Sequence, residues 1–495
     1  MRRLLPRVAA ALALAALLLQ PWRVTLGSNT PHAARQREAG SRQRVAGNRG
    51  RAIGWDSLPS VLARIRPPQF PARDFKITDY GAVGDGSFDN TEAIRKAIET
   101  CHAAGGGRVV VPAGIFLTGA IHLLSNVNLH LEEGATLKFS TDPSKYLPAV
   151  FTRFEGTECM NYSPLIYAFE QENIAVTGPG TLDGSASEEN WWAWSRKGPN
   201  GADAPARADI RRLIEYGERG TPVRERVFGA GHYLRPNFIQ PYRSRNVLIE
   251  GVRIVNSPMW EIHPVLSENV TVRGVEIHSH GPNNDGCDPE SSRDVLVENC
   301  VFDTGDDCIA IKSGRDNDGR RVGVAAENII VRNCTMKDGH GGVVIGSEIS
   351  GGCRNVFAED CRMDSPNLDR ALRFKSNARR GGVVENVFMR NVEVGRVAEA
   401  ILTIDFMYET GPNGPYKPVV RNVELQNVRS QSSPRVMWIA SWPGAVIDDV
   451  RFVDCTFRGV ETAEMLQNAG SISFRNVNIE PARKTNSRNS RANWP

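Results

Sequence analysis

The sequence has few aromatic residues, little excess charge and no long apolar run near its N-terminus. Of its 495 residues, 7% are aromatic, and the formal net charge is only +4. The apolar run from Val8 to Leu19 is too short for a transmembrane helix, which needs about 20 residues. These absences argue against a stable membrane span. They also argue against a surface that acts as a whole as a receptor for polyanions, so we expect no nucleic-acid partner.

The N-terminus has the features of a secretory signal peptide. Arg2, Arg3 and Arg7 precede the apolar run, and cleavage after Gly27 would give a signal peptide over residues 1–27. The alternative is an uncleaved membrane anchor. We expect a secreted or periplasmic protein without stable membrane insertion after cleavage.

Positive charge is concentrated at the two ends of the chain. Residues 1–27 hold four Arg and no acid, and residues 28–54 hold six Arg against Glu38, so the chain from Trp55 onward carries about −5. We therefore predict an Arg-rich disordered linker over residues 28–66 and a disordered basic tail over residues 483–495. Residues 67–482 are left as the folded domain, and any anionic ligand must be met there by local cations.

The folded region begins with alternating residues and a short helix. Phe75 to Gly81 alternates as a strand does, and Ile94, Ala97, Ile98 and Cys101 share one face of a helix that starts near Asp89. Strands are predicted around residues 109–111 and 126–131. This order suits a short helix that caps the end of an all-β stack.

A repeat is the strongest structural signal in the sequence. An Asn or Asp followed by Val or Ile recurs, with the apolar member at Val247, Val270, Val295, Ile329, Val356, Val387, Val423, Val450 and Val477. Five residues further on stand small apolar residues or cysteines: Val252, Val275, Cys300, Cys334, Cys361, Val392, Val428, Cys455 and Ala482. The register persists while the spacing varies from 23 to 36 residues. We predict inward-facing ladders of a parallel β-helix with loops of different lengths.

The ladder also bears on the cysteines. Four of the nine cysteines occupy the position that valine fills in other coils, so we expect them to be buried thiols. The other five, Cys101, Cys159, Cys287, Cys308 and Cys353, leave room for one or two disulfide bridges. No cysteine and histidine spacing resembles a zinc site, and His102, His232 and His263 are interpreted as surface or core residues. We expect no metal and no cofactor.

The same register brings polar residues together on neighbouring coils. Asp306 lies eleven residues after Val295, and His340 lies eleven after Ile329, so the two should lie one above the other. Asp285 belongs to the coil before that of Asp306, and Lys375 to a later one. An unpaired buried charge is costly, whereas paired carboxylates with room for water perform acid/base chemistry. We therefore predict a catalytic face; for Asp306-Asp307 alone, a solvated turn is the alternative.

At these residues the sequence resembles the polygalacturonase family, family 28 of the glycoside hydrolases, from about Phe75 to Tyr408. Four family motifs, Asn-Thr-Asp, Asp-Asp, Gly-His-Gly and Arg-Ile-Lys, match in order Asn283-Asn284-Asp285, Asp306-Asp307, Gly339-His340-Gly341 and Arg373-Phe374-Lys375. Tyr408 looks like the family's substrate-contacting tyrosine. Asn284 and Phe374 depart from the motifs, and the Phe374 side chain should point away from the cations beside it.

The resemblance implies a right-handed parallel β-helix that hydrolyses α-1,4-linked galacturonic acid with inversion and without a metal. Carried over, Asp306 would be the general acid, Asp285 and Asp307 would activate the water, and His340 would tune the acid. Arg373 and Lys375 would bind the galacturonate carboxylate, with Asn283 and Tyr408 as further substrate-binding residues. The substrate would be a pectic polysaccharide or oligogalacturonide, and we expect a monomer.

A polar insertion bears on the mode of attack. Between Trp191 and Arg235 the chain carries arginines at 207, 211, 212, 219, 224 and 226. Folded over one end of a groove, this segment would block long chains and favour exo action; the alternative is a solvated loop. The run from Asn283 to Ser291 resembles bacterial exo-type relatives more than fungal endo-types, which favours exo. The tryptophans could stack on sugar rings or pack a loop.

Three other functions stay open at this point. Within the family, the nearest competitor is a rhamnogalacturonan or xylogalacturonan hydrolase, and His340 argues against the former. A pectate lyase shares the β-helix but needs calcium-binding carboxylates and an arginine base. A non-enzymatic carbohydrate-binding β-helix, such as an adhesin or tailspike, would give no reason for the acidic residues to converge.

Overall fold

The computed structural model describes residues 53–197, 202–462 and 464–482. The predicted signal peptide over residues 1–27, most of the Arg-rich linker and the basic tail over residues 483–495 lie outside the described residues. Within them, no helix is long and apolar enough to cross a membrane.

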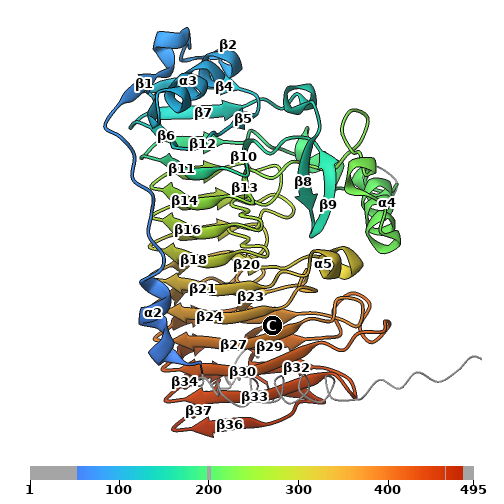
Figure 1. Ribbon diagram of the computed structural model, residues 1–495. Helices are drawn as coiled ribbons and strands as arrows, with labels where there is room; N and C mark the ends of the chain where they lie inside the picture. The colour runs from blue at the N-terminus through green and yellow to red at the C-terminus, as the bar shows by residue number, and fades with distance from the viewer. Residues whose placement is uncertain (1–52, 198–201, 463, 483–495) are drawn as a thin grey trace, which may run out of the picture. The chain divides into compact units, whose positions relative to one another are not determined.

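The described chain winds into a parallel β-helix whose coils contribute one strand to each of up to three sheets (Figure 1). The first sheet has 13 strands, in order β1 (Asp74–Lys76), β3 (Gly107–Val111), β6 (Val127–Leu131), β11 (Glu172–Thr177), β14 (Arg245–Glu250), β16 (Glu268–Arg273), β18 (Arg293–Glu298), β21 (Ala326–Arg332), β24 (Cys353–Glu359), β27 (Val383–Arg390), β30 (Val419–Gln426), β33 (Val446–Val453) and β36 (Ile472–Arg475).

The second sheet follows the first around each coil. Its 13 strands are β2 (Asp85–Asp89), β4 (Gly114–Thr118), β7 (Ala135–Phe139), β12 (Thr181–Asp183), β15 (Arg253–Val255), β17 (Glu276–Ser279), β19 (Val301–Thr304), β22 (Thr335–Met336), β25 (Arg362–Met363), β28 (Glu393–Arg396), β31 (Arg429–Ser432), β34 (Thr456–Val460) and β37 (Asn478–Pro481).

The third sheet is interrupted in the middle of the stack. One part holds β5 (Ile121–His122), β10 (Ile166–Phe169) and β13 (Ile239–Tyr242), and the other holds β20 (Ile309–Ile311), β23 (Val343–Ile345), β26 (Arg370–Lys375), β29 (Ala400–Asp405), β32 (Arg435–Ala440) and β35 (Met465–Gln467). Between β13 and β20, isolated bridges at Ile262 and Cys287 continue the parallel register. The candidate active site lies at this interruption and just beyond it.

The Asn/Asp-Val repeat has a backbone cause. The polar member of each pair has a positive φ, for instance 60° at Asn355 and 61° at Asn386, which Asn and Asp tolerate better than other side chains. The amide of Asn386 donates to the Oδ1 of Asn355 at 3.0 Å, and that of Asn355 donates to Asn328 at 3.0 Å. The sequence pattern thus records a turn that each coil repeats at one corner and a ladder of stacked amides.

The predicted ladders are confirmed through Val450 and corrected in the last coil. The parallel register aligns the apolar members from Val247 to Val450, and all of them are buried. The residue level with Val450 is Ile472, not Val477. Val477 instead directly precedes Asn478, which is level with Thr456, so it takes the position predicted for Ala482. Because the two ladders are only five residues apart in the sequence, the prediction assigned Val477 to the first ladder although it belongs to the second.

The cysteines are all buried free thiols. Cys300, Cys334, Cys361 and Cys455 lie in the core ladder as predicted. The five cysteines for which one or two bridges were left open are free as well, so none of these bridges forms in the structure.

The N-terminal end of the stack carries the predicted helix. α3 (Thr91–Ala103) buries Ile94, Ala97, Ile98 and Cys101 against the core. The predicted strand from Phe75 to Gly81 is shorter than expected, because after β1 the chain enters a 3₁₀ turn, η2 (Ile77–Tyr80), which buries Ile77.

Residues 53–66 were predicted to belong to the disordered linker, but the structure describes them as an ordered segment on the first sheet (Figure 1). η1 (Trp55–Ser57) leads into α2 (Leu58–Leu62). Leu58, Val61 and Ile65 pack with four outward-facing apolar residues of that sheet, Leu296, Ile330, Phe357 and Phe388. The linker prediction is wrong here because these outward residues give the segment an apolar surface to cover.

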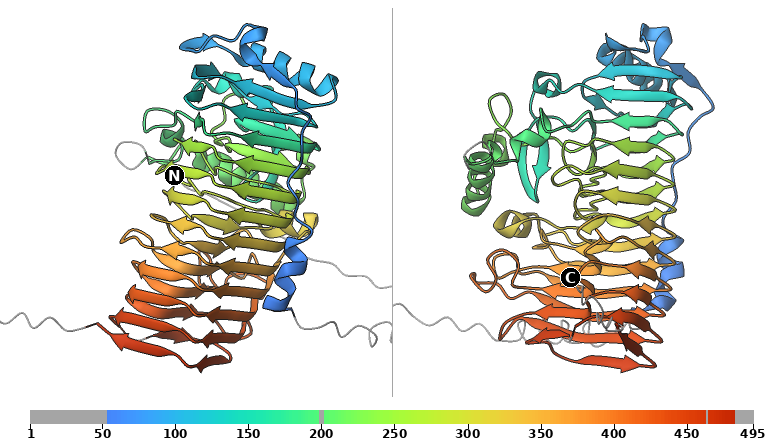
Figure 2. Two further views of the ribbon diagram at one scale, coloured as in Figure 1. Left: turned by 90° about the vertical axis from the view of Figure 1, so that its left-hand side faces the viewer. Right: turned by 180° about the vertical axis from the view of Figure 1, so that it is seen from behind.

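The insertion between the early coils stands out from one side of the stack, on the same side as α5 (Asp316–Val322) (Figure 2). Two inserted segments lie there. The first holds η3 (Pro143–Tyr146) and an antiparallel hairpin of β8 (Val150–Phe154) and β9 (Thr157–Asn161); the second, the predicted insertion between Trp191 and Arg235, holds η4 (Trp191–Trp194), α4 (Ala206–Arg219) and η6 (Val223–Glu225). Buried ion pairs hold both segments in place: Arg153 of β8 meets Glu290 at 3.0 Å, and Arg226 of the predicted insertion meets Asp318 of α5 at 2.7 Å. The insertion is therefore a docked substructure rather than a solvated loop.

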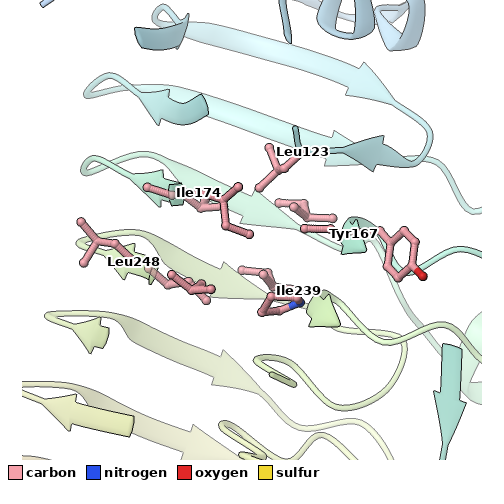
Figure 3. A pocket seen from close by; sticks show the side chains of 12 residues that line it. Leu123, Tyr167, Ile174, Ile239 and Leu248 are labelled. Carbon is pink, nitrogen blue, oxygen red and sulfur yellow. The ribbon is translucent and has the colours of Figure 1, made fainter. Parts of the chain in front are cut away.

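An apolar cavity inside the stack is too small to hold a ligand. It lies among Leu123, Tyr167, Ile174, Ile239 and Leu248 (Figure 3). Its volume of about 10 Å³ is no larger than the space needed by a single water molecule. It is a packing gap between coils.

Candidate active site

The coil that carries Asp285 is shaped by Asn284. The Asn284 Oδ1 accepts hydrogen bonds from the Ser279 hydroxyl at 2.7 Å and the Gly281 N–H at 2.8 Å. Its amide donates to the carbonyl of Ser257 on the previous coil at 3.0 Å. Asn284 is fully buried and fixes the turn from the second sheet toward the third. The middle residue of the Asn-Asn-Asp motif therefore positions the carboxylate that follows it.

Asp306 and His340 lie one above the other on adjacent coils, as the register predicts. The His340 N–H donates to the carbonyl of Asp306 at 3.0 Å, and the His340 Nδ1 lies 2.9 Å from the Asp306 Oδ1. The flanking glycines permit this approach, since a Cβ at Gly339 would lie 2.7 Å from the Asp306 carbonyl oxygen. Among Asp285, Asp306 and Asp307, Asp306 is the carboxylate that solvent reaches, with a side chain 19% exposed.

Asp307 is fully buried and meets two cations. The Lys375 Nζ lies 2.6 Å from its Oδ2, and an Arg373 guanidinium nitrogen lies 3.6 Å from its Oδ1. Both cations are on β26, where strand alternation places Arg373 and Lys375 on one face. Phe374 between them is buried in the core, as predicted.

Lys312 is a site residue that the sequence analysis missed. It follows β20, and its ammonium lies 3.4 Å from Asp285, 3.5 Å from Asp288 and 3.3 Å from Glu348. The ammonium also lies 4.3 Å from the centre of the Trp260 ring. Burial disfavours its charge, but the carboxylates outweigh this and raise the pKa of Lys312. It thus offsets the negative charge of Asp285 inside the protein, where both side chains are buried.

The pKa values of Asp285 and Asp306 are shifted in opposite directions. Burial, and then the charge of Asp306, raises the pKa of Asp285 well above its ordinary value. Burial alone would raise the pKa of Asp306 as well, but its hydrogen bond to His340 and the nearby cations lower it to about 2. The hydrogen bond to Asp306 in turn raises the pKa of His340 to about 9. The surroundings therefore favour the charged form of Asp306 and disfavour that of Asp285.

Tyr408 and Asn283 border the cluster. The Tyr408 ring centre lies 5.6 Å from the Lys375 ammonium and 5.9 Å from the Arg373 guanidinium, within cation–π range. The Asn283 Oδ1 accepts a 2.7 Å hydrogen bond from Arg235. Arg235 is buried and also donates to the carbonyls of Pro258 and Pro282, at 2.8 and 2.7 Å. The structure thus brings all eight predicted site residues into one region and adds Lys312 and Arg235.

A cavity adjoins this region on the side of the insertion. It has a volume of about 350 Å³. Its charged lining is mostly cationic: Lys197, Arg207, Arg211 and Arg235, against Glu155. Asn283, two residues before Asp285, lines it as well, so the cavity lies beside the carboxylate cluster. The other arginines of the insertion do not line it, and Arg226 is buried against Asp318.

The tryptophans of the insertion pack the loop that carries them. Trp191 is buried, with ring centres 4.7 Å from Trp194 and 5.6 Å from Tyr146. The Trp192 indole donates to the carbonyl of Ser257 at 2.9 Å. Of the two roles considered for these residues, the contacts favour packing.

Comparisons with known proteins identify the family of this chain. Residues 230–473 match the model of a family described as glycosyl hydrolases family 28. Residues 75–136 match a model described as rhamnogalacturonase A/epimerase, pectate lyase-like. The chain is 30% identical to an exo-poly-alpha-D-galacturonosidase of Dickeya chrysanthemi, over 71% of this chain and 62% of that one. It is 30% identical to a probable polygalacturonase of Vitis vinifera, over 65% of this chain and 60% of that one. The chain thus spans about 60% of the length of these curated relatives.

A solved structure matches over more of its length. The crystal structure of a hyperthermoactive exopolygalacturonase from Thermotoga maritima is 48% identical to this chain, with a TM-score of 0.83. The match covers 86% of this chain and 96% of that one. The expected right-handed parallel β-helix is confirmed by this likeness and by the sheet topology.

Proposed function

The chain belongs to family 28 of the glycosyl hydrolases, and on this basis we propose that it cleaves α-1,4-galacturonosyl linkages of pectin or polygalacturonate by a metal-independent inverting reaction, releasing units from a chain end. The substrate is a cell-wall polysaccharide, so the proposal includes a secreted or periplasmic location and action as a monomer. The observation that carries it is the buried Asp307 held by Lys375 and Arg373 beside the solvent-accessible pair of Asp306 and His340.

The cations on β26 select an anionic sugar. Arg373 is only loosely paired with Asp307, at 3.6 Å, and its guanidinium can form a bidentate contact with a carboxylate. Lys375 makes the tighter contact with Asp307 and adds a point charge. We assign the galacturonate carboxylate to these two residues, with Tyr408 and Asn283 as further contacts to the sugar.

The two carboxylates with divergent pKa values divide the acid and base roles. Asp306 is the solvent-accessible one, so we assign it the donation of a proton to the leaving oxygen. Coupled carboxyls titrate as a pair, and a hydrogen bond from Asp306 to the glycosidic oxygen favours its protonated form. With Asp306 carrying the proton, Asp285 and Asp307 are left as the carboxylates that activate the water. His340 holds Asp306 in place through the Nδ1 contact.

The cationic cavity beside Asn283 supports exo action. A galacturonan chain is anionic at every residue, and a cavity closed by α4 offers its end Lys197 together with the exposed guanidinium groups of Arg207 and Arg211, which pair with Asp203 at 2.7 and 3.8 Å. The buried ion pairs that dock the insertion keep this wall in place. We propose that the terminal galacturonate occupies this cavity and that longer chains extend away from it.

The test is hydrolysis of polygalacturonic acid by the purified chain with a chelator present. We expect reducing ends without absorbance of unsaturated uronides, and monomer or dimer from the first time point. Longer early products would overturn exo action, and chelator-sensitive absorbance would indicate a lyase. If polygalacturonate stays intact while rhamnogalacturonan or xylogalacturonan is cleaved, the substrate assignment is wrong. Binding without cleavage of any of them would favour a carbohydrate-binding protein.

The acid and base assignments need a separate experiment. An aryl α-galacturonide with a good leaving group requires little proton donation. If Asp306 is the acid, Asp306→Asn should lose far less activity on this substrate than on polygalacturonate. If Asp285→Asn behaves in that way instead, the two roles are exchanged.

A further inference from the structure

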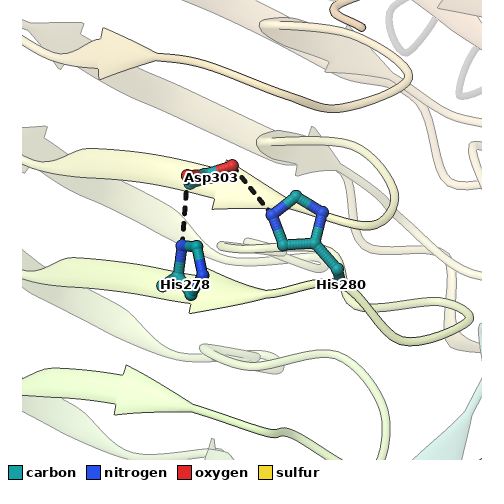
Figure 4. A group of neighbouring side chains, drawn as sticks. All are labelled: His278, His280 and Asp303. Carbon is teal, nitrogen blue, oxygen red and sulfur yellow. Dashed lines mark hydrogen bonds and ion pairs between the residues drawn. The ribbon is translucent and has the colours of Figure 1, made fainter.

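Two imidazoles and one carboxylate meet on the second sheet, outside the candidate active site (Figure 4). His278 is on β17, His280 follows directly after it, and Asp303 is on β19. The parallel register places Asp303 level with His278 on the next coil. Because side chains alternate along a strand, His278 and His280 lie on the same face.

The three side chains converge on one point. The His278 Nδ1 lies 3.1 Å from the Asp303 Oδ2, and the His280 Nε2 lies 2.8 Å from the Asp303 Oδ1. One ligand atom from each residue lies within 4.8 Å of the other two. We propose that His278, His280 and Asp303 bind one divalent transition-metal ion, for which Zn²⁺ is the best match.

The donor set and its spacing fit zinc. Zn²⁺ takes imidazole nitrogen and carboxylate oxygen at about 2.0–2.2 Å in tetrahedral geometry, so its ligand atoms stand ~3.3 Å apart. The observed separations of 2.8 and 3.1 Å, each to a different oxygen of Asp303, and the limit of 4.8 Å on the third separation are within reach of such a site by side-chain rotation. Two histidines and one carboxylate leave the fourth position for water. The His278 side chain is 59% exposed and that of His280 41%, so this position faces solvent.

The surroundings do not already neutralise Asp303 with a cation. Among the described residues, its ion pairs are with these two histidines. Lys337 lies on the following coil, where its N–H donates to the carbonyl of Phe302 at 2.8 Å. Within that same part of the chain, no ion pair joins Lys337 to Asp303. A metal ion can therefore take the carboxylate without displacing a lysine or arginine.

The site joins two coils just before they supply the candidate catalytic carboxylates. His280 precedes Asp285 by five residues, and Asp303 precedes Asp306 by three. The coils are in close contact here, since a Cβ at Gly305 would lie 2.7 Å from the carbonyl carbon of His280. A bound ion would hold them together and raise the temperature of unfolding, without contacting the reacting sugar.

The experiment is calorimetric titration of the full chain with Zn²⁺ after chelator treatment and dialysis, at about pH 7.5, above the ordinary pKa of a histidine side chain in a model peptide. We expect one ion per chain and a higher unfolding temperature. His280→Gln and Asp303→Asn should each weaken binding at least about 10- to 100-fold, the loss that removal of even an outer-sphere partner causes. His102→Gln is the matched control, because it removes an exposed imidazole elsewhere and should leave binding unchanged.

A second measurement keeps the proposal falsifiable if a variant folds poorly. Anomalous diffraction at the zinc edge from soaked wild-type crystals should give a peak between the three side chains. No binding to the wild-type chain would overturn the proposal. So would a peak elsewhere, or binding that survives His280→Gln but is lost in His340→Gln, since the ion would then occupy the other histidine and carboxylate cluster.

Discussion

Two clusters of histidine and aspartate lie a few residues apart along the same coils. They differ in that a lysine and an arginine pair with the first cluster but not with the second. Asp306, Asp307 and His340 bring their ligand atoms within 4.8 Å of one another, as do His278, His280 and Asp303. In the first cluster, Lys375 lies 2.6 Å from Asp307 and Arg373 lies 3.6 Å from it. In the second, the described ion pairs of Asp303 are with histidines.

The difference shows that ligand geometry alone does not define a metal site. A fixed ammonium already supplies the positive charge that an ion would bring, and it repels a second cation at short range. The cluster with cations is suited to a proton, a water molecule and an anionic sugar. The cluster without them is suited to a metal ion.

The largest effect is expected at the solvent-accessible carboxylate of the first cluster. Asp306→Asn removes the proposed proton donor and should lower kcat on polygalacturonate by about 10²- to 10⁴-fold. The matched control is Asp360→Asn, at an exposed turn where the carboxylate accepts from Asn391 at 3.0 Å and an amide can replace it. Reducing-end release measures both. Equal activity in wild type and Asp306→Asn would remove Asp306 from the mechanism.

A second large effect is expected from removing the cation behind the site. Lys312→Met leaves Asp285, Asp288 and Glu348 buried without their shared ammonium, which should cost about 3–5 kcal/mol of unfolding free energy. Denaturant unfolding measures it. Lys138→Met, at an exposed strand position, should change stability by no more than about 0.5 kcal/mol. If both variants lose the same amount, the carboxylates do not depend on Lys312.

These two residues also show what the sequence could predict. Asp306 and His340 were found because each stands at the same distance from a ladder residue, and the ladder is visible through its turn chemistry, in which Asn or Asp takes a positive φ. Lys312 was missed because its carboxylate partners lie on two other segments, at residues 285–288 and at Glu348, and only the folded register joins them. Asp303 was missed for the same reason, since its relation to His278 is a pairing between strands.

The ordered segment over residues 53–66 could not be recognised from its own composition. Leu58, Val61 and Ile65 form a small apolar set among arginines and prolines. The surface that they cover is made by outward-facing residues on four separate strands, including Phe357 and Phe388, whose positions follow only from the coil register. The repeat predicted which residues point inward, but not that some outward residues would be covered as well.

A smaller effect is expected from a variant that removes the difference in charge between the two clusters. Lys375→Met removes the ammonium closest to Asp307, so Asp306, Asp307 and His340 should become a second zinc site with an affinity about tenfold or more above that of the same cluster in wild type. Zinc titration in the His280→Gln background isolates this cluster from the proposed surface site. If zinc affinity there does not rise, the cation is not what excludes a metal ion.

The smallest effect concerns the pH dependence of stability. The hydrogen bond to Asp306 raises the pKa of His340 to about 9, above the ordinary value of about 6.5 for histidine. A raised pKa in the folded state means that the pair's stabilisation is fully present below about pH 6.5 and is lost as the pH rises through about 9. Because the His340 side chain is 52% exposed, solvent screening limits the contribution to at most about 1 kcal/mol.

His340→Gln isolates this contribution, since glutamine cannot take up the proton. The unfolding free energies of wild type and His340→Gln should differ most at about pH 6 and converge near pH 10, because the charge on His340 is then lost in the wild type as well. His102→Gln serves as the control for removal of an imidazole. A difference that stays constant over this range would mean that the His340 contact to Asp306 acts through packing and neutral hydrogen bonding, and that the first cluster owes its charge balance to its lysines and arginine alone.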